Sequence, residues 1–406
     1  MRRRPLLAAL WPAAWAGALD GPWLRAHGAS LDQARDNPPL GISQRPLRFP
    51  ADHGAHPDTH VEWWYVTGWL RRASASAPAR LSASEPAQRP DFGFQVTFFR
   101  LRTDVAALSA SRFAARQLVF AHVALTDLAA VSAAGGRNAP LLLHDQRIAR
   151  EGFGLAETPG TAGRQVALLQ DWTLARAPAS AADPGTLEVA VRAERFRLAL
   201  TLRATQPTML QGREGYSQKG PQPHQASHYY SEPQLAVQGQ VESRAGDTSA
   251  RSVDVTGRAW LDHEWSDEYL PSEAVGWDWI GFNLFDGGAL MAFRLRRPDG
   301  SALWGGGSHR DAGGSLRTFA AGELAFRPLR TWTSTRTGVR YPVEWQVETP
   351  VGSFRVAALA DDQELDSRAS TGALYWEGLS ALNGADGRTL GWGYLELTGY
   401  AERLRM

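Results

Sequence analysis

The pattern of apolar and polar positions along the chain is that of many short β-strands. Between Val61 and Leu70 almost every residue is bulky or β-branched, which favours a strand whose side chains alternate between two faces. One face carries Trp63, Tyr65, Thr67 and Trp69, and the other carries Glu62, Trp64, Val66 and Leu70. Because both faces are largely apolar, we expect this strand to be covered on both sides.

Similar runs recur at roughly ten-residue spacing, and no window shows a long helical period. Residues 73–90 are rich in Ala, Ser and Pro, and we expect a loop there. Many short strands separated by turns predict an all-β fold, either a sandwich or a barrel. The expected strands are 92–101, 119–126, 147–154, 166–174, 187–191, 196–204, 277–284, 289–296, 304–310, 316–319, 343–348, 352–358 and 391–400.

The two halves of the chain share an internal repeat. The opening strand Trp63–Gly68 matches Trp277–Gly281, and the repeat predicts two similar β units that meet near residues 263–275. The closing strands also match, Tyr230–Glu232 with Tyr375–Glu377 and Gly257–Asp262 with Gly391–Glu396.

The stretch from Val255 to Gly288 is the strongest candidate for a functional site. Buried carboxyl groups beside aromatic faces must be paired, hydrogen-bonded or protonated, and such mixtures are typical of sites. The alternative is that these acids are solvated at strand ends. The stretch contains Trp260, Trp265, Trp277 and Trp279 together with Asp262, His263, Glu264, Asp267, Glu268 and Asp278.

Side-chain alternation divides this stretch. Asp262 and Glu264 share one face of their strand, whereas His263 and Trp265 share the other. Asp278 points away from its two tryptophan neighbours, so it needs an aromatic side chain from another strand. In the second copy of the repeat, Leu397 and Thr398 stand at the positions of His263 and Glu264. The end of the strand therefore does not by itself require these polar side chains.

Two further clusters hold chemically active side chains. The first lies on a Gly/Pro loop, and although its histidine spacing suits zinc, we expect it to cap a barrel mouth instead. The second places a serine near a lysine and histidines, but the chain has no G-x-S-x-G motif to support a nucleophile. The first cluster consists of Asp52, His53, His56, Asp58 and His60. The second cluster consists of Lys219, His224, His228, Tyr229, Tyr230 and Ser231.

Several long motifs resemble the AttH-like, carotenoid 1,2-hydratase (hydroxyneurosporene synthase-type) family. They lie at residues 49–70, 216–235, 257–270, 276–296 and 375–400, so the resemblance covers most of the chain. The resemblance implies an all-β fold of two tandem lipocalin-like β-barrel domains. It also implies either a hydratase that adds water to a terminal C=C bond of an acyclic carotenoid without a cofactor, or a companion of an ABC transporter.

The family's His-x-Trp motif matches His263-Glu264-Trp265, and Trp277-Asp278 is the pair nearest to its downstream Tyr-x-Asp. Hydration needs an acid, an aromatic wall for the cation and a water. The expected catalytic residues are Asp278, His263, Glu264 and Asp262, and the expected ligand-binding residues are Glu62, Trp64, Trp265, Trp277, Trp279 and Tyr230. In this hypothesis Asp278 or a nearby acid donates the proton, His263 handles the water, and no metal or cofactor takes part.

The first residues predict export. Arg2-Arg3-Arg4, the uncharged run Pro5–Leu19 and the small residues Ala16–Ala18 read as a signal peptide over 1–18. An arm over 19–45 and barrel domains over 46–266 and 267–406 would follow. We therefore expect a periplasmic or secreted protein.

Composition narrows the partners. A net charge of +1 without a basic tract after the start makes nucleic acid an unsuitable partner. The 16 tryptophans suit the lining of an apolar pocket. We expect an apolar isoprenoid or lipid ligand, with an ABC transporter and peripheral membrane contact as further partners.

Two classes of function fit these observations. One is an enzyme, a cofactor-free hydratase or a related acid–base lyase or hydrolase. The other is a non-catalytic lipid carrier that works with an ABC exporter. An enzyme needs a buried acid that faces the ligand cavity, whereas a carrier does not.

Overall fold

Strand β1 (Val61–Arg72) lies at the centre of a large antiparallel sheet and is buried at almost every position in the computed structural model. It pairs with β2 (Phe92–Arg102) on one side and with β13 (Arg251–Ser266) on the other. Aromatic and β-branched side chains pack well on a pleated surface, so both of its faces can be covered. The expectation of a doubly covered strand is confirmed.

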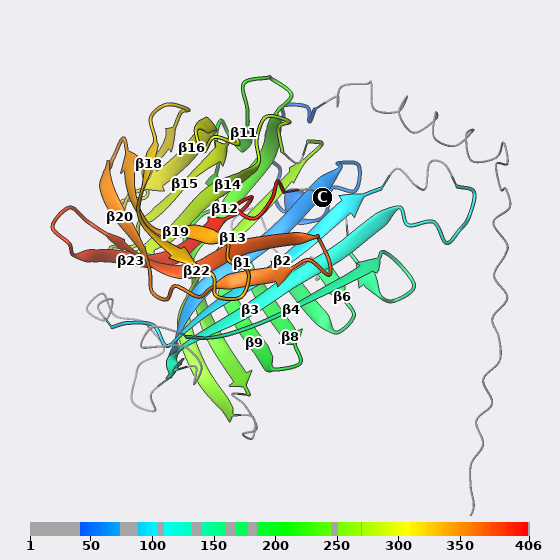
Figure 1. Cartoon of the computed structure of the whole chain (residues 1–406). Helices are drawn as coiled ribbons and strands as arrows, with labels where there is room; N and C mark the ends of the chain where they lie inside the picture. Colours follow the sequence, from blue (N-terminus) through cyan, green and yellow to red (C-terminus); the bar gives the residue numbers. More distant parts are fainter. Residues whose placement is uncertain are drawn as a thin grey trace, which may run out of the picture. The chain divides into compact units, whose positions relative to one another are not determined.

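The first sheet has thirteen strands and curls until β6 contacts β3 and β4, which nearly closes a barrel (Figure 1). Its order is β4-β3-β2-β1-β13-β12-β9-β8-β7-β6-β5, with β10 and β11 paired to β12. The remaining bounds are β3 (Gln117–Val131), β4 (Pro140–Arg150), β5 (Ala156–Glu157), β6 (Ala167–Leu169), β7 (Trp172–Arg176), β8 (Thr186–Arg192), β9 (Phe196–Arg203), β10 (Met209–Leu210), β11 (Tyr216–Gln218) and β12 (Ala226–Ser243).

The second sheet has ten strands in the order β17-β16-β15-β14-β23-β22-β20-β19-β18, with β21 paired to β22. Its bounds are β14 (Gly276–Leu284), β15 (Ala289–Arg296), β16 (Ala302–Arg310), β17 (Leu316–Phe319), β18 (Ala325–Thr333), β19 (Arg340–Thr349), β20 (Gly352–Ala358), β21 (Glu364–Ser367), β22 (Ala373–Asn383) and β23 (Thr389–Leu397). The described residues contain one short 3-10 turn, η2 (Ala51–His53), and no α-helix. The all-β fold of two tandem lipocalin-like barrels is confirmed.

The sheet registers confirm the repeat and correct one of its strands. Tyr65 lies opposite Asp262, and Trp279 lies opposite Glu396, so each opening strand pairs with its own closing strand. On β12, however, Ser231 lies opposite Asp262, whereas on β22 it is Glu377 that lies opposite Glu396. The sequence match is therefore wrong by one residue on this strand. The registers relate Tyr229-Tyr230-Ser231 to Tyr375-Trp376-Glu377.

Some predicted strand limits are wrong because edge strands carry weak patterns. The sequence predicts a strand over 147–154, whereas β4 is Pro140–Arg150 and pairs with β3 alone. Its side chains from His144 to Arg147 are partly exposed and polar, which hides the alternation. The edge strand β18 is missed for the same reason, since most of its residues are exposed.

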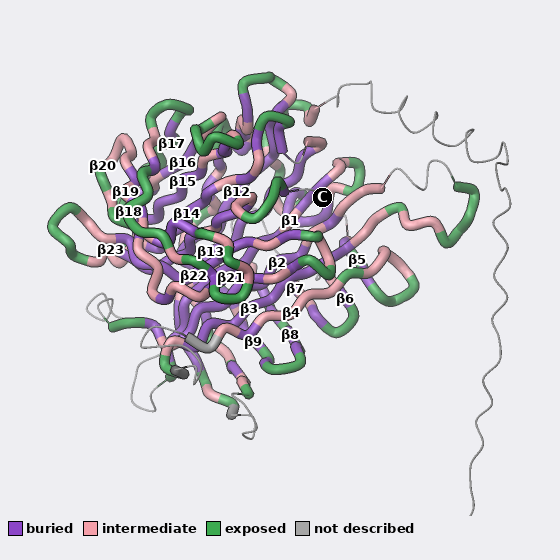
Figure 2. The backbone as a smooth tube through the Cα atoms, viewed as in Figure 1, coloured by how far each residue is buried: buried purple, intermediate pink, exposed green. Residues whose placement is uncertain are grey.

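Three large apolar cores hold the fold together, beside a small fourth cluster around Leu365 and Tyr375. One fills the first barrel around Trp64 and Trp172, and another fills the second barrel around Trp345 and Trp376. The third lies between the sheets, where side chains such as Trp260 from the first sheet pack against side chains of the second. Buried residues accordingly run along the central strands, and exposed residues gather at the turns (Figure 2). The repeat-related strands meet directly, β1 with β23 and β13 with β14.

The structure describes residues 41–73, 88–103, 109–131, 140–159, 167–177, 185–244, 251–268 and 270–404. The predicted signal peptide, most of the predicted arm and most of the loop over 73–90 lie outside these residues. The described end of the arm packs on the first barrel, where His228 Nε2 contacts the carbonyl oxygen of Ser43 at 3.1 Å. Within the described ranges, no helix has the length and apolar character needed to cross a membrane.

We predict that the repeat-related glycine Gly257 is required by close strand packing. A Cβ atom there would lie 1.9 Å from the carbonyl oxygen of Trp69, a backbone atom that cannot move aside easily. Gly257→Ala should lower the free energy of unfolding by about 1–3 kcal/mol or more. Chemical denaturation measures this, with Gly313→Ala as control, because its Cβ would meet only the flexible Asp311 carboxylate at 3.3 Å. Equal stability of the two variants would contradict the prediction.

Candidate acid–base site between the two sheets

Strand alternation places the predicted site residues in three separate environments. Asp262, Glu264, Trp277 and Trp279 face a cavity between the two sheets. His263, Glu62, Trp64, Tyr230 and Trp265 lie on the opposite face of the first sheet, inside the first barrel. Asp278 lies on the opposite face of β14 from its tryptophan neighbours. The residues that the sequence predicted as a single cluster therefore lie on opposite faces of the sheets.

The cavity between the sheets has a volume of about 110 Å³ and is lined by both halves of the chain. Its wall is mainly aromatic, with carboxyl groups set into it. The first sheet contributes Trp63, Tyr65, Thr97, Phe99, His122, Ser227, Tyr229, Asp262 and Glu264. The second contributes Trp277, Trp279, Phe293, Leu295, Tyr375, Glu377, Glu396 and Thr398, and Lys219 joins from the connection after β11.

Asp262 is a buried carboxyl group held by three donors. Tyr229 donates to Oδ2 at 2.6 Å, and Oδ1 accepts from the Ser231 hydroxyl at 2.5 Å and the Trp260 indole at 2.6 Å. Burial raises the pKa of Asp262, the three donors oppose this shift, and Glu264 adds to it, so that the pKa is about 7. Asp262 therefore exchanges a proton near neutral pH.

Glu377 and Glu396 form a second acidic pair, directly opposite each other on β22 and β23. Like charges at directly opposed positions repel, and one proton relieves the repulsion. Burial and the negative charges of Asp262 and Glu264 raise the pKa of Glu396 to about 7, although a hydrogen bond from Trp277 lowers it. Burial and the neighbouring Glu396 hold the pKa of Glu377 well above its usual range.

Lys219 supplies a positive charge to the cavity. Its Nζ atom lies 2.9 Å from Oε1 of Glu264 and 4.1 Å from the ring centroid of Phe293. Ser227 also donates to the Glu264 carboxylate. Glu264 is therefore held as an ion pair, which leaves Asp262, Glu377 and Glu396 to share protons.

Tyr375, the repeat partner of Tyr229, is held by an imidazole rather than by an acid. Its hydroxyl lies 2.8 Å from Nδ1 of His122, whose Nε2 lies 2.8 Å from the hydroxyl of Ser370. Burial lowers the pKa of His122 to about 3, so this imidazole is neutral at pH 7. Both Tyr375 and His122 line the cavity.

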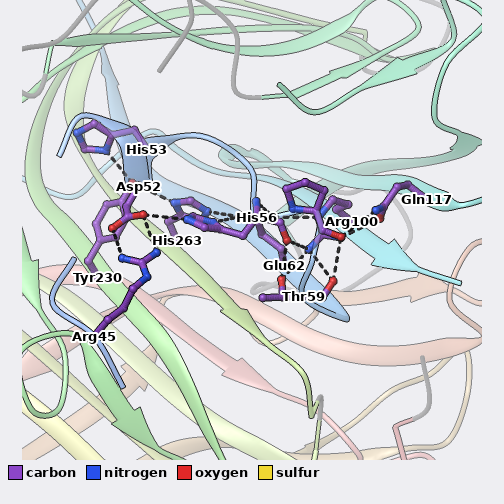
Figure 3. A network of polar contacts seen from close by, with 11 residues as sticks. Arg45, Asp52, His53, His56, Thr59, Glu62, Arg100, Gln117, Tyr230 and His263 are labelled. Atoms are coloured by element: carbon purple, nitrogen blue, oxygen red, sulfur yellow. Dashed lines mark hydrogen bonds and ion pairs between the residues drawn. The ribbon is translucent and has the colours of Figure 1, made fainter. Parts of the chain in front are cut away.

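His263 belongs to a hydrogen-bonded chain inside the first barrel (Figure 3). Its Nε2 lies 2.8 Å from Oε1 of Glu62, and its Nδ1 lies 3.1 Å from the hydroxyl of Tyr230, which also contacts Nδ1 of His53 at 2.8 Å. Burial lowers the pKa of His263 to about 4, although Glu62 opposes this shift. His263 is thus a neutral imidazole on the opposite face of β13 from the cavity.

Glu62 is the centre of this network. His56 Nδ1 contacts Oε1 at 2.7 Å, and Arg100 Nε donates to Oε2 at 2.9 Å (Figure 3). Burial would raise the pKa of Glu62, but hydrogen bonds from His263 and His56 hold it well below its usual range. His56 also contacts Asp52 at 3.2 Å, and these two carboxylates raise the pKa of His56 against the effect of burial.

The donor set His56, Glu62 and His263 is the one among the described residues that resembles a metal site. Their ligand atoms lie within 4.8 Å of one another. One oxygen of Glu62 already accepts from both imidazoles, and Arg100 neutralises the same carboxylate. These contacts satisfy the polar atoms without an ion. The loop histidines thus bind the chain before β1 to the barrel.

The expected role of Asp278 as proton donor needs correction. Its carboxylate accepts from Arg294 Nε at 2.6 Å, from Arg296 Nε at 3.1 Å and from the hydroxyl of Tyr400 at 2.8 Å. Two guanidinium groups stabilise the charged carboxylate, and the side chain does not line the cavity. Asp278 is an ion-paired residue of the second sheet rather than a neutral acid in an aromatic box.

Sequence reasoning gave no site role to several residues that line the cavity. Glu396 had a signal, because the repeat aligns it with Asp262. Glu377 was hidden by the one-residue error in the repeat, and Lys219 and Tyr229 stood in the cluster that was weighed as a serine hydrolase site. His122 had no signal, since it is a lone histidine within an apolar strand.

The fold and the cavity define a class of protein, a tandem β-barrel protein with an acid-lined aromatic cavity between its sheets. The chain belongs to the AttH-like family, whose family model matches residues 41–400. A crystal structure of a protein assigned as AttH from Nitrosomonas europaea shares 44% sequence identity with it, with a TM-score of 0.74, and the match covers 90% of this chain and 100% of that one.

Two other solved structures share the fold at low sequence identity. Kievitone hydratase from Nectria haematococca is 14% identical with a TM-score of 0.61, and the match covers 90% of this chain and 97% of that one. CghA with Sch210972 is 16% identical with a TM-score of 0.51, covering 90% and 96%. No curated protein sequence matches this chain.

We predict an unusual pH dependence of stability from Asp262. Its pKa rises from 3.8 to about 7 on folding, so between these values the folded state holds a proton that the unfolded state has lost. The contribution of Asp262 is therefore fully present below pH 3.8 and is lost as the pH rises to about 7, by at most about 4 kcal/mol. Asp262→Asn lacks this loss.

Urea denaturation of the natural chain and of Asp262→Asn at several pH values measures the effect. The amide of the variant changes the free energy of unfolding by an amount that does not depend on pH. The difference in unfolding free energy between the variant and the natural chain should therefore shift in favour of the variant as the pH rises from 4 to 7. Parallel pH curves for the two proteins would contradict the prediction.

We also predict that Arg100 is essential to the network around Glu62. Arg100 and Glu62 are both fully buried, and Arg100→Met would remove the guanidinium group that contacts this carboxylate. The expected loss of unfolding free energy is about 3–5 kcal/mol. Arg102→Met on the same strand is the matched control, because Arg102 is only half-buried and donates to a backbone carbonyl. Equal denaturation midpoints for the two variants would contradict the role.

Proposed function

We propose that this protein is a cofactor-free acid–base enzyme of the hydro-lyase type that adds water to a C=C bond of an apolar substrate in the cavity between the sheets. One observation carries the proposal: Asp262, a carboxyl group with a pKa of about 7, faces an aromatic cavity. A general acid works best when its pKa lies near the operating pH. A lipid carrier has no need of such a group.

The residues of the cavity suit each step of hydration. Asp262 transfers its proton to one alkene carbon, where a C–H bond forms from the π electrons and leaves a cation on the other carbon. The faces of Trp63, Trp277 and Trp279 stabilise such a cation, each by roughly 1–2 kcal/mol or more when desolvated. Water then forms the C–O bond and releases its proton to a carboxylate, so the net change is the addition of one water.

The Glu377 and Glu396 pair suits the final proton transfer. The two carboxyl groups share protons, and the pKa of Glu396 is about 7, so the pair accepts a proton near neutral pH. It lies on the second sheet, whereas Asp262 lies on the first, and both carboxyls line the same cavity. The proposed donor and acceptor therefore approach the substrate from different walls. This replaces the earlier expectation that Asp278 and His263 perform these steps.

The size of the cavity restricts what reacts there. A volume of about 110 Å³ is smaller than the roughly 150 Å³ of an apolar cavity that holds benzene. A long isoprenoid or lipid can therefore place only one end group in it. This supports reaction at a terminal double bond, as the resemblance to carotenoid 1,2-hydratases implies. Kievitone hydratase shows that the fold is compatible with hydration. Its sequence identity of 14% is too low to assign its substrate to this chain.

The hydrolase alternative has no support at Ser231. Its hydroxyl donates to Asp262 and accepts from Gln211 at 2.8 Å, and the side chain is completely buried and does not line the cavity. We further propose a periplasmic or secreted setting, on the basis of the Arg-rich start, with an ABC transporter as the supplier of ligand. N-terminal sequencing of the natural protein tests the setting.

We predict that Asp262→Asn abolishes hydration, because an amide cannot donate the required proton. The purified chain is incubated with lycopene or neurosporene in detergent and ¹⁸O-labelled water, and chromatography with mass spectrometry detects a labelled 1-hydroxy product. General acid catalysis contributes about 10²–10⁴-fold, so the variant should lose at least about 100-fold in rate. Polyene binding, followed by tryptophan fluorescence, should stay near normal.

Asp278→Asn is the matched control, since it removes a carboxylate outside the cavity. Its rate per folded molecule should stay close to that of the natural chain. Tight polyene binding without any product in the natural chain would favour the lipid carrier instead. Loss of activity in Asp278→Asn with retention in Asp262→Asn would overturn the assignment of the acid.

A further inference from the structure

An aromatic and arginine patch projects from one end of the first barrel. It consists of Phe113, Phe153 and Leu155 with Arg112, Arg116 and Arg150, on the turns that connect β2 to β3 and β4 to β5. Phe113 is 57% exposed, Phe153 59% and Leu155 46%. Large apolar side chains that gather on a surface at such exposure mark interaction sites.

The patch is organised rather than incidental. The rings of Phe113 and Phe153 stack with centroids 5.9 Å apart, although they come from different turns. The Arg150 guanidinium lies 4.0 Å from the ring centroid of Phe153 and donates to the carbonyl oxygen of Phe113 at 2.6 Å. Arg112 lies 5.0 Å from the centroid of Phe113. The arginines thus hold the exposed rings together from the sides.

The backbone at Phe153 supports outward presentation of its ring. Phe153 has φ 60°, between Gly152 at 88° and Gly154 at 70°. A bulky residue is rarely found in this left-handed region, and the conformation needs a reason in the surrounding structure. The apolar core supplies none, because the ring is exposed. The turn instead holds an aromatic side chain in solvent beside Phe113.

The charges of the patch select its partner. Among the described residues, Arg112, Arg116 and Arg150 form no ion pair with a carboxylate. The neighbouring Glu151 carboxylate accepts hydrogen bonds from Thr158 at 3.0 and 3.2 Å instead. Aromatic and leucine side chains flanked by free arginines match the boundary between lipid headgroups and acyl chains in anionic membranes.

We propose that this patch docks the protein on the surface of a bilayer that contains anionic lipids, with the two phenylalanines inserted at the headgroup boundary. A protein partner fits less well. A stable protein interface covers about 800 Å² per partner, and three apolar side chains on two turns cannot fill its core. The docking surface does not depend on the chemistry of the cavity.

The position of the patch connects it to the cavity. Phe99 lines the cavity on β2, and the same strand ends at Arg102, after which the backbone N–H of Thr103 donates to the carbonyl oxygen of Arg116 beside the patch at 2.9 Å. The three residue steps from Phe99 to Arg102 span roughly 10 Å, so the cavity and the patch both lie toward the C-terminal end of β2. Docking would bring the cavity close to a source of apolar molecules.

Vesicle co-sedimentation of the full chain tests the proposal, with vesicles of phosphatidylcholine alone or mixed with phosphatidylglycerol. The natural chain should bind the mixed vesicles more tightly, and salt should weaken the binding. F113S/F153S should weaken it by about tenfold or more, because the apolar insertion is lost. R112Q/R150Q should remove the preference for phosphatidylglycerol. Circular dichroism confirms that each variant is folded.

L316S/L329S is the matched control, since Leu316 (44% exposed) and Leu329 (51%) are surface leucines of the second sheet. This variant should bind like the natural chain. Equal binding by F113S/F153S, or no binding of the natural chain to either vesicle, would overturn the proposal, and the second result would favour a protein partner. Asp262→Asn should bind vesicles normally, so a failure of docking and a failure of hydration are distinguishable.

Discussion

Burial of both faces of the central strands is the constraint on which the rest of this structure depends. Strands β1 and β13 have a barrel core on one side and the second sheet on the other, so most of their side chains are removed from bulk water. Each carboxyl group there must then be neutralised by a cation or by a proton. Glu62 and Asp262 meet this requirement in opposite ways, because alternation sends them to different faces of the sheet.

Inside the first barrel the carboxylates are neutralised by cations. Glu62 contacts Arg100 and His56, and Glu232 contacts Arg176 at 3.0 Å. Among the described residues that line the cavity between the sheets, Lys219 is the one lysine or arginine, whereas Asp262, Glu264, Glu268, Glu377 and Glu396 are acids. A single positive charge cannot compensate five carboxyl groups, and buried like charges favour protonation. The first arrangement is fixed and suits structure, whereas the second stores protons near neutral pH and suits acid–base chemistry.

The sequence predicted the all-β fold, the tandem barrels and the covered strand β1, because the alternation of side chains and the internal repeat can be read directly from the order of residues. It also placed Asp262 and Glu264 apart from His263 and Trp265, which the sheet geometry bears out. It could not identify which acid is paired, because Arg294, Arg296 and Tyr400 reach Asp278 only after β15 and the chain end fold against β14. Glu377 and His122 lie 255 positions apart and line the same cavity only because the two sheets pack against each other.

The repeat explains how the cavity obtained acids on both walls. Related strands meet at the seam, so a carboxyl group at one repeat position appears twice, as Asp262 and as Glu396. The copies then differ where the chemistry requires it, since Ser231 corresponds to Glu377. In the first copy the serine donates to the acid and lowers its pKa, whereas in the second a glutamate repels its partner. Two similar barrels thus give one site with unequal walls, and an asymmetric reaction such as proton donation on one side and proton removal on the other needs that inequality.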